Sequence, residues 1–232
     1  MILNIFDALA FIIGLAIIYF FLPHLIRCWQ VYRLKKTCIR SHLLVLTYDG
    51  ELGDKLALRI LDLLAQDKIK ATFFCTGQDA AKHPEILNRL AAEGHEIGCH
   101  ASRHLNAWKS WPWDALCDIK VAYQQLSKWV APDAVFRPPY GKLNILTFVF
   151  LCLKRIPLGW WTIVSGDTTY PFGDPKKAGG AVARDKGGVV LLHIFDGSPG
   201  HLEFVLQATR SLLETAKQEG MKLCRLCDLP ES

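Results

Sequence analysis

Residues 43–50 read LLVLTYDG, an apolar run that ends in a carboxylate. Further short apolar runs follow along the chain, each separated from the next by a helix-like segment. Strands that alternate with helices predict a parallel α/β arrangement, either open or closed into a barrel. The predicted strands are Leu43–Tyr48, Ala71–Cys75, His95–Cys99, Ala134–Arg137, Gly159–Val164, Gly188–His193 and Met221–Leu226.

Helical periodicity appears between these runs. Two predicted helices begin at Pro84 and His201. We expect them to end at Gly94 and Gly220, because glycine readily adopts the left-handed conformation that is favoured at a helix C-terminus. Between the first two strands, apolar residues recur on one face of a predicted helix: Leu56, Ile60, Leu63 and Leu64.

Ionisable residues follow or close five of the predicted strands. In a parallel α/β fold the carboxyl ends of the strands meet on one rim, where the chemistry takes place. We therefore expect these residues to build one site: Asp49, His100, Arg137, Asp167 and His193.

His100 and His104 are four residues apart, a spacing that lets two imidazoles hold one metal ion. Two unrelated surface histidines are the alternative interpretation. The segment Gly94–His100 favours the metal site, because a predicted strand delivers the first histidine to the rim.

The other rim residues form a predicted base and a predicted acid. Asp49 beside Arg137 would stay ionised and accept a proton. His193 beside Asp167 would be oriented and kept in its charged form. A metal ion, a base and a separate acid together describe metal-assisted hydrolysis of an amide.

The N-terminus predicts a membrane anchor. Residues 2–26 are predominantly apolar, and residues 8–22 are uninterrupted, which is enough to cross a bilayer with some tilt. No basic residue precedes this run and no small-x-small cleavage site follows it, so we expect a retained helix and not a removed signal peptide. The predicted organisation is an anchor with a basic juxtamembrane segment at 1–40 and one catalytic domain at 41–232.

Charge and cysteine content bear on partners and on sidedness. The net charge is +5, and residues 1–40 carry most of it, so a nucleic-acid partner is not expected. Positive residues after the anchor favour a cytoplasmic catalytic domain at the inner membrane. The eight cysteines show no disulfide framework, which favours the same side.

Five segments, in this order and spacing, resemble the motifs of NodB-type carbohydrate esterases, the carbohydrate deacetylase family. The resemblance covers about residues 42–229 and implies a distorted (β/α)7 barrel of seven strands, preceded here by the transmembrane helix. It also implies a divalent metal, usually zinc. The segments are Thr47–Gly50, His100–His104, Arg137–Gly141, Trp161–Asp167 and Leu191–His193.

The resemblance implies a role for each matching residue. The backbone N–H of one of them would hold the oxyanion, as donors aimed at developing charge do. The roles are His100 and His104 as metal ligands, Asp49 as the base tuned by Arg137, Tyr140 as the oxyanion donor, and His193 as the acid held by Asp167.

The chain departs from the family pattern in the first motif. The family has two consecutive aspartates, the second a metal ligand, and this chain has Gly50 at the second position. Three arrangements are open: Glu51 or Asp54 supplies the third ligand, Asp49 binds the metal itself, or the site binds metal poorly. Of these we favour Glu51 as the ligand. Val164 and Ile194 also stand where the family often has acidic residues.

The expected reaction is removal of an N-acyl group, with acetyl as the first choice, from an amino sugar. Leu143–Leu153 is apolar nearly all round, and Trp108, Trp111 and Trp113 follow the histidines. These features predict that the mouth of the site rests on membrane lipid and accepts a polyprenyl-phosphate linked glycan precursor. The alternatives are a catalytically impaired sugar-binding or scaffolding member of the fold, or a deformylase or O-acyl esterase.

Overall fold

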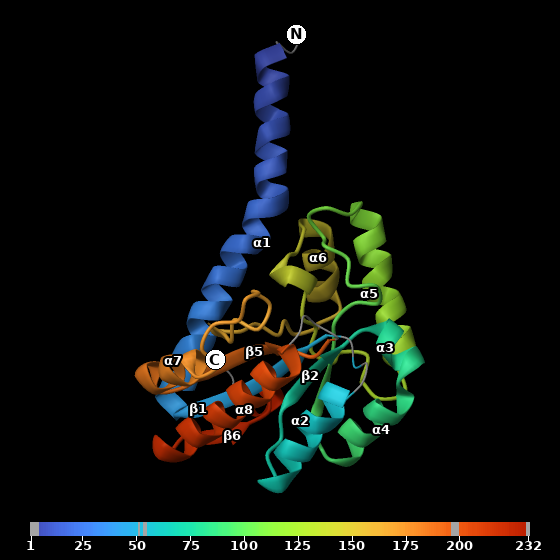
Figure 1. Cartoon of the computed structure of the whole chain (residues 1–232). Helices are drawn as coiled ribbons and strands as arrows, with labels where there is room; N and C mark the ends of the chain where they lie inside the picture. Colours follow the sequence, from blue (N-terminus) through green and yellow to red (C-terminus); the bar gives the residue numbers. More distant parts are fainter. Residues whose placement is uncertain (1–4, 51, 53–54, 196–199, 231–232) are drawn as a thin grey trace.

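The computed structural model describes residues 5–50, 52, 55–195 and 200–230. A parallel sheet lies at its centre (Figure 1). Its strand order is β3-β2-β1-β5-β4. The last strand, β6, pairs with the first half of β1, and β2 pairs with its second half. The strands are β1 Leu43–Asp49, β2 Thr72–Cys75, β3 Glu96–Cys99, β4 Ile163–Val164, β5 Gly188–His193 and β6 Lys222–Cys224.

Hydrogen bonds close the sheet into a distorted barrel. Phe136 forms parallel bridges with Cys99 on one side and Leu158 on the other. The segment that starts at Leu158 then reaches β5, where the N–H of Thr162 donates to the carbonyl oxygen of Val189 over 2.9 Å. The predicted parallel α/β barrel is confirmed.

The prediction of a fourth strand over Ala134–Arg137 is wrong. Within it the structure forms a bridge at Phe136 alone and no extended ladder. Pro138 and Pro139 come directly afterwards and have no N–H to donate, so the pairing stops there.

Helices pack around the barrel where the periodicity predicts them. All four residues of the predicted face between β1 and β2 are buried. The helices that begin at Pro84 and His201 also form as predicted. The surrounding helices are α2 Lys55–Gln66, α3 Gly77–Lys82, α4 Pro84–Ala92, α5 Pro112–Leu126, α6 Ile145–Leu153, α7 Lys177–Asp185 and α8 His201–Gln218, with short 3-10 turns at Pro139–Gly141 and Leu226–Asp228.

Strand β1 is buried along its whole length, as expected of a strand enclosed on both faces. Tyr48 points outward, stacks on Phe73 with 5.0 Å between ring centroids, and meets Thr209 of α8. Its neighbours Thr47 and Asp49 point the other way, into the barrel. The alternation along β1 therefore delivers Asp49 to the interior at the carboxyl end of the strand.

Helix α1, Ile5–Ser41, is continuous for 37 residues and contains Pro23. At 1.5 Å per residue it is about 55 Å long. Its N-terminal half is apolar and long enough to cross a membrane. Figure 1 shows that the N-terminal half of α1 extends away from the domain, while the C-terminal half packs along the barrel. The basic stretch predicted beside the membrane is thus part of a packed helix.

The packed half of α1 fixes the direction of the exposed half. Cys38 is fully buried against Val45 and Val189, near the start of β1. Phe20, five turns earlier, contacts Trp108 of the loop that follows β3, with ring centroids 5.7 Å apart. Helix α1 therefore runs antiparallel to β1 and leaves the barrel at the end where the strands finish.

Candidate active site

The buried floor of the site is an ion pair between Arg137 and Asp49. The Nη1 atom of Arg137 donates to Oδ1 of Asp49 over 2.6 Å and to Oγ1 of Thr47 over 2.8 Å. The Nε and Nη2 atoms of Arg137 donate to the backbone carbonyls of Gly159 and Trp160. Arg137 is fully enclosed, so these partners take the place of water around its charge.

His100 lies beside Asp49, and His104 lies beside His100. The backbone carbonyl of Arg137 lies 2.8 Å from Nδ1 of His100, and a carbonyl only accepts, so Nδ1 carries the proton and Nε2 the lone pair. Burial lowers the pKa of His100 to about 4, although Asp49 favours the charged form. His100 is therefore neutral at pH 7, as a metal ligand must be.

The histidine pair has a spacing that fits one metal ion. The Nε2 atoms of His100 and His104 are 3.1 Å apart. Two nitrogens bound to a tetrahedral zinc ion at about 2.0–2.1 Å would be roughly 3.3 Å apart. The Oδ2 atom of Asp49 lies 3.8 Å from Nε2 of His100. In the described part of the chain, however, no group of three His, Cys, Asp or Glu side chains is arranged to hold a metal ion.

The predicted third ligand, Glu51, lies outside the described residues, as does Asp54. The position before them, Gly50, has φ = 127°, a conformation that side chains rarely adopt. A Cβ atom there would lie 2.6 Å from the carbonyl oxygen of Ile194. The backbone at Gly50 therefore leaves no room for the aspartate that the family pattern has.

The second ion pair joins β5 to the loop after β4. The carboxylate of Asp167 accepts from the backbone N–H of His193 over 2.6 Å and lies 3.0 Å from Nδ1 of the ring. Burial alone would lower the pKa of His193, but the hydrogen bond and charge of Asp167 more than offset burial and raise it. The ring is thus held by Nδ1, and its Nε2 atom is the end that can meet a substrate.

The two ion pairs adjoin because their strands do. Asp49 and His193 are register partners on β1 and β5, and the N–H of Ile194 donates to the carbonyl oxygen of Asp49 over 2.7 Å. Negative charge on Asp49 also favours the charged form of His193. A proton acceptor and a proton donor therefore stand next to each other at the carboxyl end of the barrel.

Tyr140 lies on the rim in the turn Pro139–Gly141. Its backbone is left-handed, with φ = 57° and ψ = 10°, and its side chain is 59% exposed. The ring lies 4.7 Å from that of His104, measured between centroids. The turn therefore places the ring of Tyr140 beside His104.

The structure brings together every described residue of the predicted site, and it gives contacts to three residues for which the sequence predicted no role. Trp161 has the guanidinium of Arg137 on its ring at 5.4 Å and that of Arg27 at 5.1 Å. Thr47 accepts from Arg137 and donates to Val190 over 2.7 Å. Arg27 is more than a hundred residues from its partners, so neither spacing nor periodicity could have revealed it.

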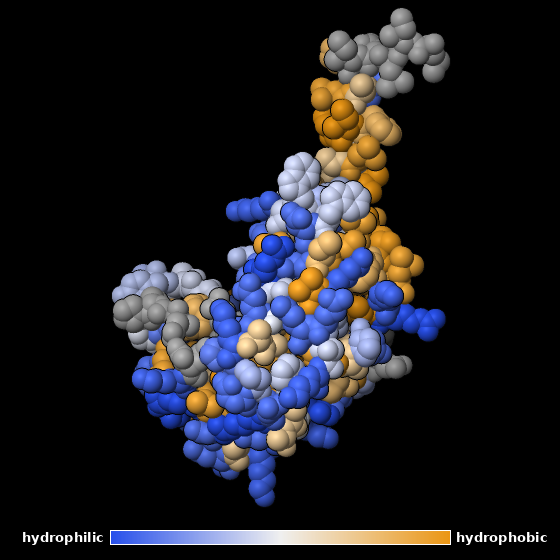
Figure 2. All heavy atoms as spheres, turned by 90° about the vertical axis from the view of Figure 1, so that its right-hand side faces the viewer, coloured by the Kyte–Doolittle hydropathy of each residue, from blue (hydrophilic) through white to orange (hydrophobic). Residues whose placement is uncertain are grey.

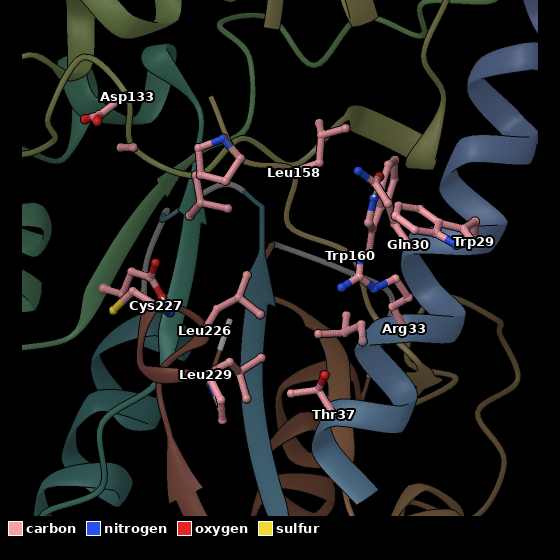
Figure 3. Close-up of a pocket in the computed structure, with 16 residues that line it drawn as sticks. Trp29, Gln30, Arg33, Thr37, Asp133, Leu158, Trp160, Leu226, Cys227 and Leu229 are labelled. Carbon is pink, nitrogen blue, oxygen red and sulfur yellow. Dashed lines mark hydrogen bonds between the residues drawn. The ribbon is translucent and has the colours of Figure 1, made fainter. Parts of the chain in front are cut away.

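A cavity of about 590 Å³ lies elsewhere, between α1 and the barrel. Figure 3 shows Trp29, Gln30 and Arg33 of α1 on one side of it and Leu226 and Leu229 on the other. None of the rim residues described above lines it. Its position gives it no part in the chemistry of the rim.

Comparison with known proteins gives a consistent result. A family model described as polysaccharide deacetylase matches residues 36–149. A peptidoglycan-N-acetylglucosamine deacetylase of Bacillus cereus is 32% identical over 192 residues, which cover 81% of this chain and 87% of that protein. A chitooligosaccharide deacetylase of a Bradyrhizobium species is 28% identical over 157 residues, with 66% and 70% covered.

Solved structures show the same fold. A peptidoglycan N-acetylglucosamine deacetylase in complex with an N-hydroxybenzamide superposes with a TM-score of 0.69 at 25% identity, covering 82% of this chain and 88% of that one. A family 4 carbohydrate esterase pseudoenzyme from Bacillus anthracis superposes with a TM-score of 0.68 at 20% identity, covering 82% and 65%. Because that fold occurs in a pseudoenzyme too, the residues of the site must decide activity.

Proposed function

Because this chain belongs to the polysaccharide deacetylase family, we propose that it is a metal-dependent hydrolase that removes an acetyl group from the nitrogen of an amino sugar. One observation carries the proposal. Asp49 and His193, each held by its own buried partner, are neighbours in register on β1 and β5, and His100 of the histidine pair lies beside Asp49. Acid, base and metal ligands are what hydrolysis of an unactivated amide requires.

Each ion pair leaves one atom for the reaction. Arg137 holds Oδ1 of Asp49, so Oδ2 is the oxygen that accepts a proton from the attacking water. Asp167 holds Nδ1 of His193, so Nε2 donates the proton that the departing amine needs. The backbone N–H of Tyr140 donates to the oxygen of the acyl group as negative charge develops there.

The metal ligands are proposed as His100 and His104, with the third from the segment that begins at Glu51. Two imidazoles and a carboxylate are a ligand set typical of zinc. A zinc ion bound there would act as a Lewis acid toward the acyl group. The protein's own part is to keep both imidazoles neutral and fixed, which burial and the carbonyl of Arg137 do for His100.

We propose further that α1 is a single-pass anchor in the cytoplasmic membrane, with the catalytic domain on the cytoplasmic side. The apolar half of α1 is largely exposed and long enough to span a bilayer. The positively charged residues that favour this orientation all follow that half. They also have structural contacts, such as the 2.8 Å ion pair between Lys35 and Asp185.

A substrate linked to membrane lipid suits this arrangement. Helix α1 leaves the barrel on the rim side, so the bilayer would face the site. The same end carries exposed tryptophans, Trp111 at 76% and Trp113 at 66%, next to the exposed Lys109. Figure 2 shows the apolar surface of α1 continuing onto the upper part of the domain. Aromatic and basic residues together are typical of the lipid interface.

The test is acetate release by the full chain in lipid nanodiscs with zinc. A polyprenyl-phosphate linked N-acetylglucosamine is compared with a soluble N-acetylglucosamine oligosaccharide. We expect release from both and a higher kcat/KM for the lipid-linked substrate. Asp49→Asn should abolish release, and Asp185→Asn, far from the rim, should not. Equal kcat/KM for the two substrates would contradict the proposal of a lipid-linked substrate. No release from either substrate would contradict the proposal that the chain is a hydrolase.

Sugar binding without hydrolysis is the second candidate, and Gly50 favours it because the family's third ligand has no room there. Calorimetric titration with the soluble oligosaccharide separates the two functions. Binding together with acetate release supports the hydrolase. Binding at full occupancy with zinc present but without release supports the sugar-binding module.

A further inference from the structure

We propose that Arg27 of helix α1 is a positioning residue for the turn Pro139–Gly141, so that the helix outside the barrel is part of the catalytic apparatus. The inference rests on the proposed function, because that turn carries the N–H assigned to the oxyanion. The family model begins at residue 36, so nothing in the family likeness assigns a role to Arg27.

The first support is direct contact. The Nη1 atom of Arg27 donates to the backbone carbonyl of Gly141 over 3.3 Å. That carbonyl is one peptide unit beyond Tyr140 and fixes the direction of the turn. The two residues Tyr140 and Gly141 are both left-handed, with φ of 57° and 63°. A bulky residue such as tyrosine holds this conformation only where its surroundings enforce it.

The second support is how tightly the turn is packed. A Cβ atom on Gly141 would lie 2.8 Å from the ring of Trp161 and 3.2 Å from the guanidinium carbon of Arg27. These two side chains therefore fill the space beneath the turn. The guanidinium lies 5.2 Å from the ring centroid of Trp160 and 5.1 Å from that of Trp161. A planar cation suits this place, because it stacks on aromatic rings and still donates hydrogen bonds.

The third support is a shared contact with the catalytic floor. Trp161 contacts Arg137 as well as Arg27, and Arg137 holds Asp49. One indole ring thus touches both the support of the turn and the support of the base. If Arg27 moves, Gly141 and the oxyanion donor next to it move directly. Asp49 is affected only through Trp161 and Arg137, which are both rigidly held.

The fourth support is that Arg27 is itself fixed. One turn further along α1, Oε1 of Gln30 accepts a 2.7 Å hydrogen bond from the indole N–H of Trp160. Gln30 and Trp160 lie side by side in Figure 3. One turn before Arg27, His24 contacts Trp108, whose indole N–H donates to Leu143 over 2.8 Å. The helix is therefore attached to the rim on both sides of Arg27.

The test uses the full chain in nanodiscs with zinc and measures kcat and KM for acetate release from the soluble oligosaccharide. Arg27→Met keeps the length of the side chain and removes its donors and charge. We expect kcat to fall about 10- to 100-fold, as when an oxyanion donor is displaced, with KM nearly unchanged. Arg27→Lys keeps one donor and should recover part of kcat.

The matched control is Arg33→Met. Arg33 lies on the same helix and on a tryptophan, with its guanidinium 4.8 Å from the ring of Trp29, but it does not contact the turn. Its kcat should equal that of the unmodified chain. Thermal melting of all variants identifies any loss of folding, and Arg27→Gln replaces Arg27→Met if the latter does not fold.

The outcomes are distinct. A lower kcat at constant KM, partial recovery in Arg27→Lys and no effect in Arg33→Met support the positioning role. An active chain whose Arg27→Met variant has the same kcat overturns it, as does a loss that parallels the melting temperature in both Arg27→Met and Arg33→Met. An unmodified chain that releases no acetate overturns the proposed function itself.

Discussion

Arg137 donates a 2.6 Å hydrogen bond to Asp49, and both side chains are enclosed by the barrel, with the arginine fully buried. Breaking a buried ion pair from one side leaves an uncompensated charge, which costs about 3–5 kcal/mol. We therefore expect Arg137→Met to lower the free energy of unfolding by about that amount. Asp49→Asn should lower the free energy of unfolding by less, because the amide oxygen still accepts a hydrogen bond from Arg137.

A double-mutant cycle checks this expectation by urea denaturation. The variant that carries both changes should lose less stability than the two single variants together, since neither partner is left charged and alone. Additive losses would show that the two side chains do not interact in the folded protein.

The pair of Asp167 and His193 predicts a pH effect. His193 must be protonated to act as an acid, and its raised pKa keeps activity to higher pH than free imidazole would. Asp167→Asn removes the charge that raises this pKa. The alkaline limb of the kcat profile should therefore move to lower pH, and an unchanged limb would show that His193 is not the acid.

The same pair predicts the pH dependence of stability. A group whose pKa is raised in the folded protein stabilises the fold fully below its unfolded pKa and loses that contribution as pH rises through the folded pKa. Thermal melting from just below the pKa of free imidazole, about 6.5, to mildly alkaline pH should therefore show the difference between the unmodified chain and Asp167→Asn shrink as pH rises. A difference that grows with pH would contradict this assignment.

A side chain at position 50 should destabilise the fold for steric reasons. Gly50→Ala places a methyl group 2.6 Å from the carbonyl oxygen of Ile194, in a backbone conformation that alanine avoids. We expect a loss of about 1–3 kcal/mol in unfolding free energy. Gly220→Ala is the control, because Gly220 also has positive φ, at 65°, but open space around it. Equal losses in both variants would show that the contact with Ile194 does not matter.

If the catalytic domain lies on the cytoplasmic side, its exposed cysteines should be inaccessible from outside an intact cell. Cys117 and Cys152 are exposed and lie beyond the membrane-spanning half of α1. A membrane-impermeant maleimide should label them after the cells are permeabilised and not before. Labelling in intact cells would place the catalytic domain outside.

Much of the architecture follows from the chain itself, for reasons that particular segments show. Strand β1 is an uninterrupted apolar run because both its faces are covered, and Asp49 ends it at the rim. The pairs of Asp49 with Arg137 and of Asp167 with His193 follow from that placement. The fourth predicted strand is a single bridge at Phe136, because its pairing depends on Cys99 and Leu158, and the local apolar run does not show where these partners lie.

Other features depend on contacts between distant parts of the chain. Arg27 and Gln30 belong to a basic stretch that suggests a membrane border, and only the folded chain brings them to Trp160 and Trp161. The close approach of the Ile194 carbonyl oxygen to Gly50 is likewise invisible in the sequence, because the two residues are far apart along the chain.

Zinc dependence of acetate release shows whether the histidine pair holds the metal ion that hydrolysis needs. It is measured in three proteins: the unmodified chain, His100→Gln and His83→Gln, the last a histidine whose Nδ1 lies 3.5 Å from the carboxylate of Glu85. Each is stripped with a chelator, assayed, and assayed again after zinc is restored, with bound zinc measured per chain. We expect the unmodified chain and His83→Gln to lose and regain both zinc and acetate release, and His100→Gln to regain neither. Release that survives the chelator, or that persists in His100→Gln, would contradict this expectation.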